Sequence, residues 1–242
     1  MKSRRPWLPR RVWFPNLLTT ANLFCGFLAI IFIIRGLDPG DNGRGWYTWA
    51  AFTICLSALF DALDGRAARA LHVASPFGKE LDSLADVVSF GVAPAVLIYE
   101  HIFRDHQLPI ASILMVALFV CCGAARLARY NVVGASGRFF TGMPIPAAGL
   151  TITGLAIFPA DLPIELLAAV VLISAGLMIS TLRYPNPEQL LFDAPLPIRI
   201  MFIGLFVIAV INPSGWFWPL PIAYITYGLL LSLLQVIRTR QV

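Results

Sequence analysis

The chain has 242 residues, of which 58% are hydrophobic and only 13% are charged, and its mean hydropathy is +0.78. Soluble domains carry about 25% charged residues, so this composition excludes an ordinary soluble protein and indicates a membrane protein. The apolar runs are continuous and not alternating, which argues against a β-barrel. The net charge of +5 comes from basic residues clustered in short loops, a placement that indicates membrane topology and anionic lipid rather than nucleic acid.

The N-terminal segment, residues 1–15, interleaves lysine and arginine with tryptophan, leucine and phenylalanine. Such a segment can lie on an anionic leaflet of the membrane. A basic tail that only sets the topology would have the same composition, and both interpretations stay open. The apolar run that follows lacks the small-residue cleavage site of a signal peptide, so we expect it to be retained as the first helix.

The apolar runs predict an all-α, polytopic membrane helical bundle with about eight transmembrane helices. The expected spans are residues 16–34, 46–63, 81–99, 108–125, 146–160, 164–182, 198–211 and 217–236. Pro15 is well placed to begin the first span, whereas Pro94, Pro144 and Pro146 are expected to kink or begin helices.

Loop charges predict that both termini are cytoplasmic. An even number of spans places the two ends on one side, and 15 lysine and arginine residues lie in the proposed inner segments against three in the outer ones. The inner residues are Lys2, Arg4, Arg5, Arg10, Arg11, Arg66, Arg69, Lys79, Arg126, Arg129, Arg138, Arg183, Arg199, Arg238 and Arg240, and the outer ones are Arg35, Arg44 and Arg104. We therefore expect an integral protein of the cell (inner) membrane.

Four aspartates interrupt this apolar sequence, although ionised carboxylates are costly in a membrane. Asp61 and Asp64 end the second span, and Asp82 and Asp86 begin the third. Spacings of three and four residues put each pair on one face of its helix. Because the two helices run in opposite directions, we expect Asp64 and Asp82 near the cytoplasmic mouth and the other two about one turn, roughly 5 Å, deeper.

Two divalent cations would neutralise these carboxylates, which would otherwise repel one another. Oxygen ligands suit Mg²⁺ or Mn²⁺ rather than zinc, and such ions are usually completed by substrate phosphates. A pair of them can polarise phosphoryl oxygens and stabilise a leaving phosphate. Aspartates that only mark the membrane interface, or pair with nearby arginines, would not need glycine and arginine at fixed offsets.

A polar loop is expected between the second and third spans, and it would contain Gly65, Arg66, Arg69, His72, Ser75 and Gly78. Gly65 leaves room for a phosphate or sugar to approach the backbone, and Arg69 is suited to bidentate phosphate binding. The polar start of the first span should lie at the same depth, where it could bind a nucleotide base or ribose; its residues are Asn16, Thr19 and Asn22.

The aspartates and their neighbours resemble the CDP-alcohol phosphatidyltransferase family. Its pattern is Asp, two residues, Asp-Gly, two residues, Ala-Arg, eight residues, Gly, three residues, Asp, three residues, Asp. Every position is filled here, by Asp61, Asp64, Gly65, Ala68, Arg69, Gly78, Asp82 and Asp86. The chain is most similar to the branch formed by bacterial phosphatidylserine synthases, through residues 82–95 and the segments 15–22, 126–131 and 142–146.

This resemblance implies a role for each residue of the pattern. Asp61, Asp64 and Asp82 would hold one metal, and Asp61, Asp82 and Asp86 the other. Asp86 would also act as general base on the acceptor hydroxyl. The predicted CDP-lipid contacts are Gly65, Ala68, Arg69, Ser75, Gly78, Asn16, Thr19 and Asn22.

A serine acceptor needs a cation for its carboxylate. Our candidates lie at the cytoplasmic end of the fourth span and are Arg126, Arg129 and Asn131. The alternative is that Arg126 and Arg129 only set the topology under the positive-inside rule.

The resemblance therefore predicts a phosphatidyltransferase that makes phosphatidylserine and CMP from CDP-diacylglycerol and L-serine, with its active site facing the cytoplasm. It implies a homodimer among membrane lipids. The expected organisation is a basic interfacial N-terminal segment at 1–15, a six-helix catalytic core at 16–182 and two additional helices in 183–242. The same chemistry with choline, glycerol 3-phosphate or inositol phosphate is an alternative, as is an ether-lipid substrate. An ion- or proton-coupled transporter is the rival from another class, but the aspartates gather at one membrane face only.

Overall fold

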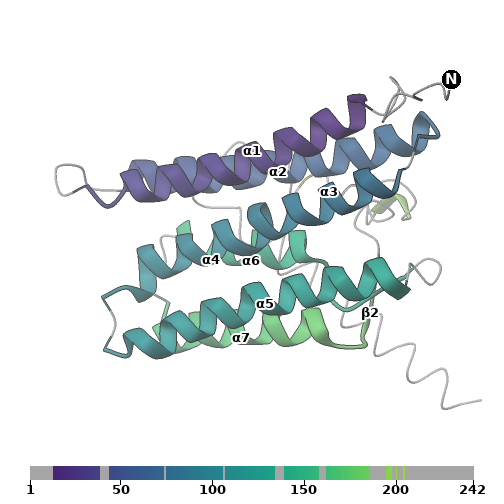
Figure 1. The fold of residues 1–242 in the computed structure, drawn as a ribbon. Helices are drawn as coiled ribbons and strands as arrows, with labels where there is room; N and C mark the ends of the chain where they lie inside the picture. The colour runs from purple at the N-terminus through teal and green to yellow at the C-terminus, as the bar shows by residue number, and fades with distance from the viewer. Residues whose placement is uncertain are drawn as a thin grey trace, which may run out of the picture.

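The computed structural model describes residues 13–38, 44–73, 75–105, 107–133, 139–157, 162–185, 195–197, 200 and 204. Six helical segments form a bundle (Figure 1): α1 (Trp13–Arg35), α2 (Arg44–Ala70), a segment from α3 (Pro76–Asp86) through η2 (Val87–Val92) and α4 (Ala93–Ile98) to η3 (Tyr99–Phe103), α5 (Pro109–Val133), α6 (Ile145–Ile157) and α7 (Ile164–Ile179). The stretches η2 and η3 are π-helical.

The helices are arranged in pairs (Figure 1). α1 packs along α2, and α5 packs along α7, with the α3–η3 segment and α6 between the two pairs. One core runs between all of these helices, and its fully buried side chains include Ile33 of α1, Ile54 of α2, Phe90 of η2, Phe119 of α5 and Met178 of α7. Helix packing, rather than a sheet, therefore positions the aspartates.

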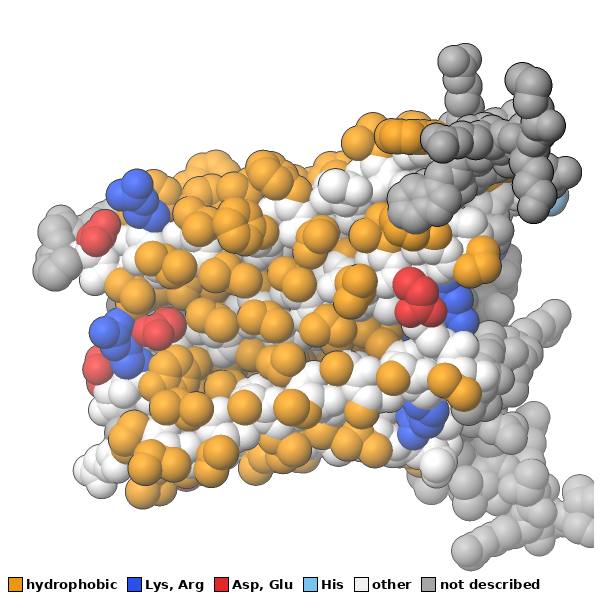
Figure 2. All heavy atoms as spheres, in the orientation of Figure 1, with side chains coloured by type: hydrophobic (Ala, Val, Ile, Leu, Met, Phe, Trp, Pro, Cys, Tyr) orange, Lys and Arg blue, Asp and Glu red, His pale blue; other side chains and the backbone are white. Residues whose placement is uncertain are grey.

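Four described helices are long and apolar enough to cross a membrane, namely Trp13–Arg35, Gly45–Ala70, Pro76–Phe103 and Pro109–Val132. Each exceeds the roughly 20 residues that a span needs. α6 and α7 are shorter apolar helices. Figure 2 shows charged side chains at the two ends of the bundle and an apolar band between them. The prediction of a helical bundle with helices fit to cross a membrane is confirmed. The eighth expected span, 217–236, lies outside the described residues, and the seventh, 198–211, is described only at positions 200 and 204.

The all-α prediction misses one small feature of the described chain. β1 (Phe139–Thr141) pairs antiparallel with β2 (Arg183–Pro185), and Phe140 lies opposite Tyr184. This ladder ties the connection between α5 and α6 to the segment that follows α7. Runs of three residues are too short for a period-two pattern to reveal them in the sequence.

The prediction of a long polar loop between the second and third spans is wrong, because the loop is shorter than expected. α2 continues to Ala70, so Gly65, Arg66 and Arg69 are helical, and Gly78 lies within α3. The alanines and arginines after Gly65 are strong helix formers, which explains the longer helix. His72, with a φ of 54°, lies in the turn that follows α2.

Proline marks two helix starts, as expected. Pro94 lies in the first turn of α4 and cannot donate a hydrogen bond to Phe90, four residues earlier. The preceding turn is π-helical, and the N–H of Ala93 bonds to the carbonyl of Val88, five residues back. α6 begins at Ile145, between Pro144 and Pro146.

Candidate active site

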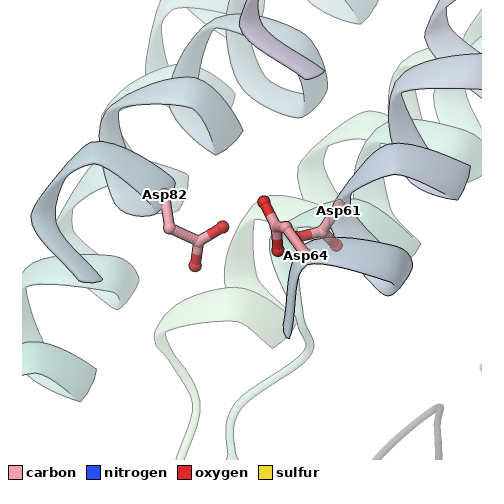
Figure 3. Close-up of side chains that lie close together, drawn as sticks. All are labelled: Asp61, Asp64 and Asp82. Atoms are coloured by element: carbon pink, nitrogen blue, oxygen red, sulfur yellow. The ribbon is translucent and has the colours of Figure 1, made fainter. Parts of the chain in front are cut away.

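Asp61, Asp64 and Asp82 form a group of carboxylates between two helices. Each offers one oxygen, and these oxygens all lie within 4.8 Å of one another. Figure 3 shows Asp82 on α3 facing Asp61 and Asp64 on α2. The short connection between the two helices turns the chain back on itself, so the spacing along each helix becomes proximity across them.

Asp86 lies one turn further along the same helical segment than Asp82, and its side chain is 6% exposed. It is within electrostatic range of Asp61 and Asp82. The side-chain amide of Asn22, on α1, donates a hydrogen bond to Asp86 Oδ1 at 3.3 Å. The structure therefore brings all four predicted aspartates to one region, with Asp86 just outside the group of three.

α1 supplies a second donor to the carboxylates. The hydroxyl of Thr19 lies 2.6 Å from Asp64 Oδ2 and donates to it. Thr19 and Asn22 are both buried, at 3% and 0% exposure. Sequence reasoning selected these two residues for the nucleotide, and it missed their contacts with the aspartates. Their nucleotide contact stays a prediction.

The residues present fit a divalent cation. One carboxylate oxygen of Asp61 lies within 4.8 Å of one of Asp82, and two ionised carboxylates this close repel each other unless a proton or a cation lies between them. Within the described part of the chain, the buried Oδ1 atom of Asp82 accepts no hydrogen bond. Three hard oxygen donors at this spacing suit Mg²⁺ or Mn²⁺.

The predicted CDP-lipid contacts lie along the ends of α2 and α3. Gly65 and Ala68 are half-buried and Arg69 is exposed, all on the last turns of α2. Ser75 caps α3, because its hydroxyl accepts a hydrogen bond from the N–H of Gly78 at 3.0 Å. Whether these residues also contact a nucleotide stays a prediction.

Gly78 also lets the first turn of α3 approach α1. A Cβ atom at residue 78 would lie 3.1 Å from Asn16 Oδ1, closer than such contacts usually are. Asn16 thus lies beside the start of α3, at the same end of the bundle as the cap. The structure brings this predicted pair together across two helices.

Of the predicted acceptor residues, Arg126 lies beside Tyr130 on α5, and Asn131 contacts α3. Arg126 is 6% exposed, and its guanidinium carbon lies 5.6 Å from the centroid of the Tyr130 ring. The Asn131 amide donates to Ser83 Oγ at 2.9 Å, so Asn131 ties α5 to α3 between the two aspartates of that segment. Lys79 donates to the Asn131 carbonyl at 3.2 Å.

Arg129 has a different environment. Its guanidinium donates to the backbone carbonyl of Ile179 at 2.6 Å and to that of Thr141 at 3.0 Å. It also donates to the carbonyls of Met178 and Ser180. These contacts hold the end of α7 against β1, a task that sequence reasoning missed. A serine-binding role for the three candidates is untested by these contacts and stays a prediction.

Comparison with known proteins agrees with this site. Residues 12–186 match the CDP-alcohol phosphatidyltransferase family. The chain is 40% identical to an archaetidylserine synthase of Methanothermobacter thermautotrophicus, over 72% of this chain and 70% of that one. It is 30% identical to a CDP-diacylglycerol–serine O-phosphatidyltransferase of Helicobacter pylori over 93% of each chain, and 37% identical to one of Methanocaldococcus jannaschii over 88% of this chain and 90% of that one. The chain belongs to the CDP-alcohol phosphatidyltransferase family.

Proposed function

We propose that this chain is an integral membrane CDP-diacylglycerol–serine O-phosphatidyltransferase, which makes phosphatidylserine and CMP from CDP-diacylglycerol and L-serine. The observation that carries the proposal is the carboxylate group of Asp61, Asp64 and Asp82 in a chain of this family. The choice of serine is supported by the relatives described above, whose names specify it.

Asp61, Asp64 and Asp82 would hold one divalent cation, Mg²⁺ or Mn²⁺. The family resemblance assigns a second to Asp61, Asp82 and Asp86. When bound, such cations neutralise the carboxylates and polarise the phosphoryl oxygens of the substrate.

Asp86 is the proposed general base. Its carboxylate would accept the proton of the serine hydroxyl as the serine oxygen forms a bond to the lipid-linked phosphorus. The bond from that phosphorus to the bridging oxygen of CMP breaks, and CMP leaves with the electron pair. Because Asp86 is only 6% exposed, bulk water has little access to it, which favours transfer to an alcohol over hydrolysis.

The proposed contacts with CDP come from residues at the end of α2 and the start of α3. Gly65, Arg69 and Ser75 would bind the CDP moiety, with the acyl chains left among the helices. Arg126 would bind the serine carboxylate, because an arginine that is only 6% exposed meets an anion with little competition from water. We also propose a cytoplasmic active site in the cell (inner) membrane, both termini cytoplasmic, a homodimer, and a catalytic core over 16–182 flanked by 1–15 and 183–242.

A second candidate keeps serine and changes the lipid. The relative that is 40% identical is named an archaetidylserine synthase, so an ether-linked CDP-lipid is a specific alternative substrate. The headgroup chemistry and the carboxylate group would be the same for both lipids.

Release of CMP by the purified protein tests the proposal. CDP-diacylglycerol or its ether-linked counterpart is supplied with Mg²⁺ or Mn²⁺ and with serine, choline, glycerol 3-phosphate or inositol phosphate. We expect CMP release with serine alone, abolished by chelation of the metal and by Asp86→Asn, with CDP-lipid binding retained in that variant. CMP release with another alcohol would show that this alcohol, and not serine, is the acceptor. If folded protein released no CMP with any of the four alcohols, the transporter would be favoured.

A further inference from the structure

Asn22 makes two contacts with the helical segment that carries Asp86. Its side-chain amide donates to Asp86 Oδ1 at 3.3 Å, and its backbone carbonyl accepts a hydrogen bond from Ser89 Oγ at 3.0 Å. Ser89 lies in η2, the π-helical stretch that begins directly after Asp86. One residue of α1 is therefore bonded both to the carboxylate and to the turn behind it.

The two backbones are in close contact at this point. Gly26 lies one turn beyond Asn22 on α1, and a Cβ atom there would overlap the Ser89 side chain. Asn22 and Ser89 are both fully buried. Tight packing of buried groups leaves little freedom for α1 to slide against η2, so the position of the Asn22 amide is set by the fold.

The amide is well suited to orient a carboxylate. Within the described chain, Asn22 supplies the hydrogen bond that the structure gives Asp86. A carboxylate terminal torsion is broad and two-fold, so an unsupported Asp86 would sample several orientations. With Oδ1 held by the amide, the other oxygen, Oδ2, is left for the cation assigned to Asp86 and for the acceptor proton.

We infer that Asn22 is a positioning residue for the transfer reaction, which holds Asp86 in the orientation that accepts the proton of the acceptor hydroxyl. This inference rests on the proposed function. It differs from a nucleotide contact by Asn22, because it assigns the effect of Asn22 to turnover and not to CDP-lipid binding.

The test compares Asn22→Leu, which keeps a similar volume without a donor, with the wild-type protein. Loss of a residue that orients a metal ligand or base typically costs roughly 10- to 100-fold in activity, and we expect kcat to fall by that factor. The KM for CDP-lipid and serine should stay close to the wild-type values. Direct binding of CDP-lipid, measured without acceptor, should also be retained.

Ser89→Ala is the matched control. It removes a buried hydrogen bond between the same two helices without touching Asp86. We expect a similar loss of thermal stability in detergent, but a kcat close to that of the wild type. Asn22→Asp, which keeps the shape and replaces the donor with an acceptor, should lose at least as much turnover as Asn22→Leu.

Three results would overturn the inference. A raised KM or weakened binding of CDP-lipid in Asn22→Leu, with kcat kept, would make Asn22 a nucleotide contact. Equal losses of kcat in Asn22→Leu and Ser89→Ala, in proportion to their stability, would make its role structural. An unchanged kcat in Asn22→Leu would overturn the inference and leave the proposed function standing. A wild-type protein that releases no CMP with any alcohol would overturn both.

Discussion

Asp64 is 5% exposed, although it lies nearer the loop end of α2 than Asp61, which is only half-buried. Depth along the helix therefore does not decide the burial of these carboxylates. Contact with α1 does, because Thr19 covers Asp64 and donates to its Oδ2 atom at 2.6 Å. A charge-assisted bond of this length fixes one oxygen of a metal-ligand candidate.

At this residue scale, we predict that Thr19→Val weakens the metal site. Valine keeps the shape of threonine and removes the donor, so Asp64 loses its orientation. Loss of a side chain that hydrogen-bonds to a metal ligand typically lowers metal affinity or activity by roughly 10- to 100-fold. The concentration of Mn²⁺ that gives half-maximal CMP release should rise accordingly.

Thr20→Val is the control, because the Thr20 hydroxyl is exposed and bonds to the Asn16 carbonyl within α1. We expect its Mn²⁺ requirement to match that of the wild type. Equal Mn²⁺ requirements in all three proteins would contradict a role for Thr19 in supporting Asp64.

At the scale of elements, the end of α7 depends on a side chain from another helix. The last carbonyls of a helix have no partner within it, and in a membrane such groups are costly. Arg129 of α5 donates to the carbonyls of Met178, Ile179 and Ser180, and to that of Thr141 in β1. A cation at a helix C-terminus also complements the helix dipole.

We predict that Arg129→Lys destabilises this junction. Lysine has a single ammonium and cannot reproduce a planar fork that spans four carbonyls. Loss of hydrogen bonds from a charged donor costs about 1.5–3 kcal/mol, which thermal unfolding in detergent would detect. Arg104→Lys is the control at the other end of the bundle, where an exposed ion pair with Glu100 at 3.1 Å contributes about 0–1 kcal/mol.

Arg126→Lys tests whether Arg126, rather than Arg129, binds the serine carboxylate. If Arg126 binds the serine carboxylate, this substitution should raise the KM for serine far more than the KM for CDP-lipid. Equal effects on both KM values would remove Arg126 from the acceptor pocket. A serine-specific effect in Arg129→Lys at unchanged stability would instead give that role to Arg129.

At the scale of the whole molecule, charged side chains lie at both ends of the apolar bundle (Figure 2). The turn after α2 and the start of α3 lie at the end that carries the carboxylate group. The connection after η3, which includes Asp105, lies at the opposite end (Figure 1). The distribution of lysine and arginine predicts that the first of these ends is cytoplasmic.

Cysteine labelling in intact cells checks this orientation. The four native cysteines, Cys25, Cys55, Cys121 and Cys122, are first replaced, and CMP release confirms that the background is active. We expect a membrane-impermeant maleimide to label Asp105→Cys directly. Leu71→Cys, at a position that is 43% exposed, should react only after the membrane is opened. The reverse pattern would place the active site on the outer face.

Several features of this protein followed from local sequence alone. Long apolar runs predicted membrane helices, because a helix must satisfy its own backbone in lipid. The spacing of Asp61 and Asp64, and of Asp82 and Asp86, predicted two carboxylate faces, because a helix repeats every 3.6 residues. The extent of α2 beyond Gly65 was not foreseen, since helix-forming residues outweighed a glycine that had been assigned to a loop.

The sequence by itself determined that four carboxylates meet at one end of a membrane bundle, because helical periodicity and the turn between two neighbouring helices require it. Only the tertiary structure decided which side chains hold them. Thr19 is 45 residues from Asp64, and Asn22 is 64 residues from Asp86. Contacts over such separations depend on how α1 packs against α2 and α3, which no local pattern encodes.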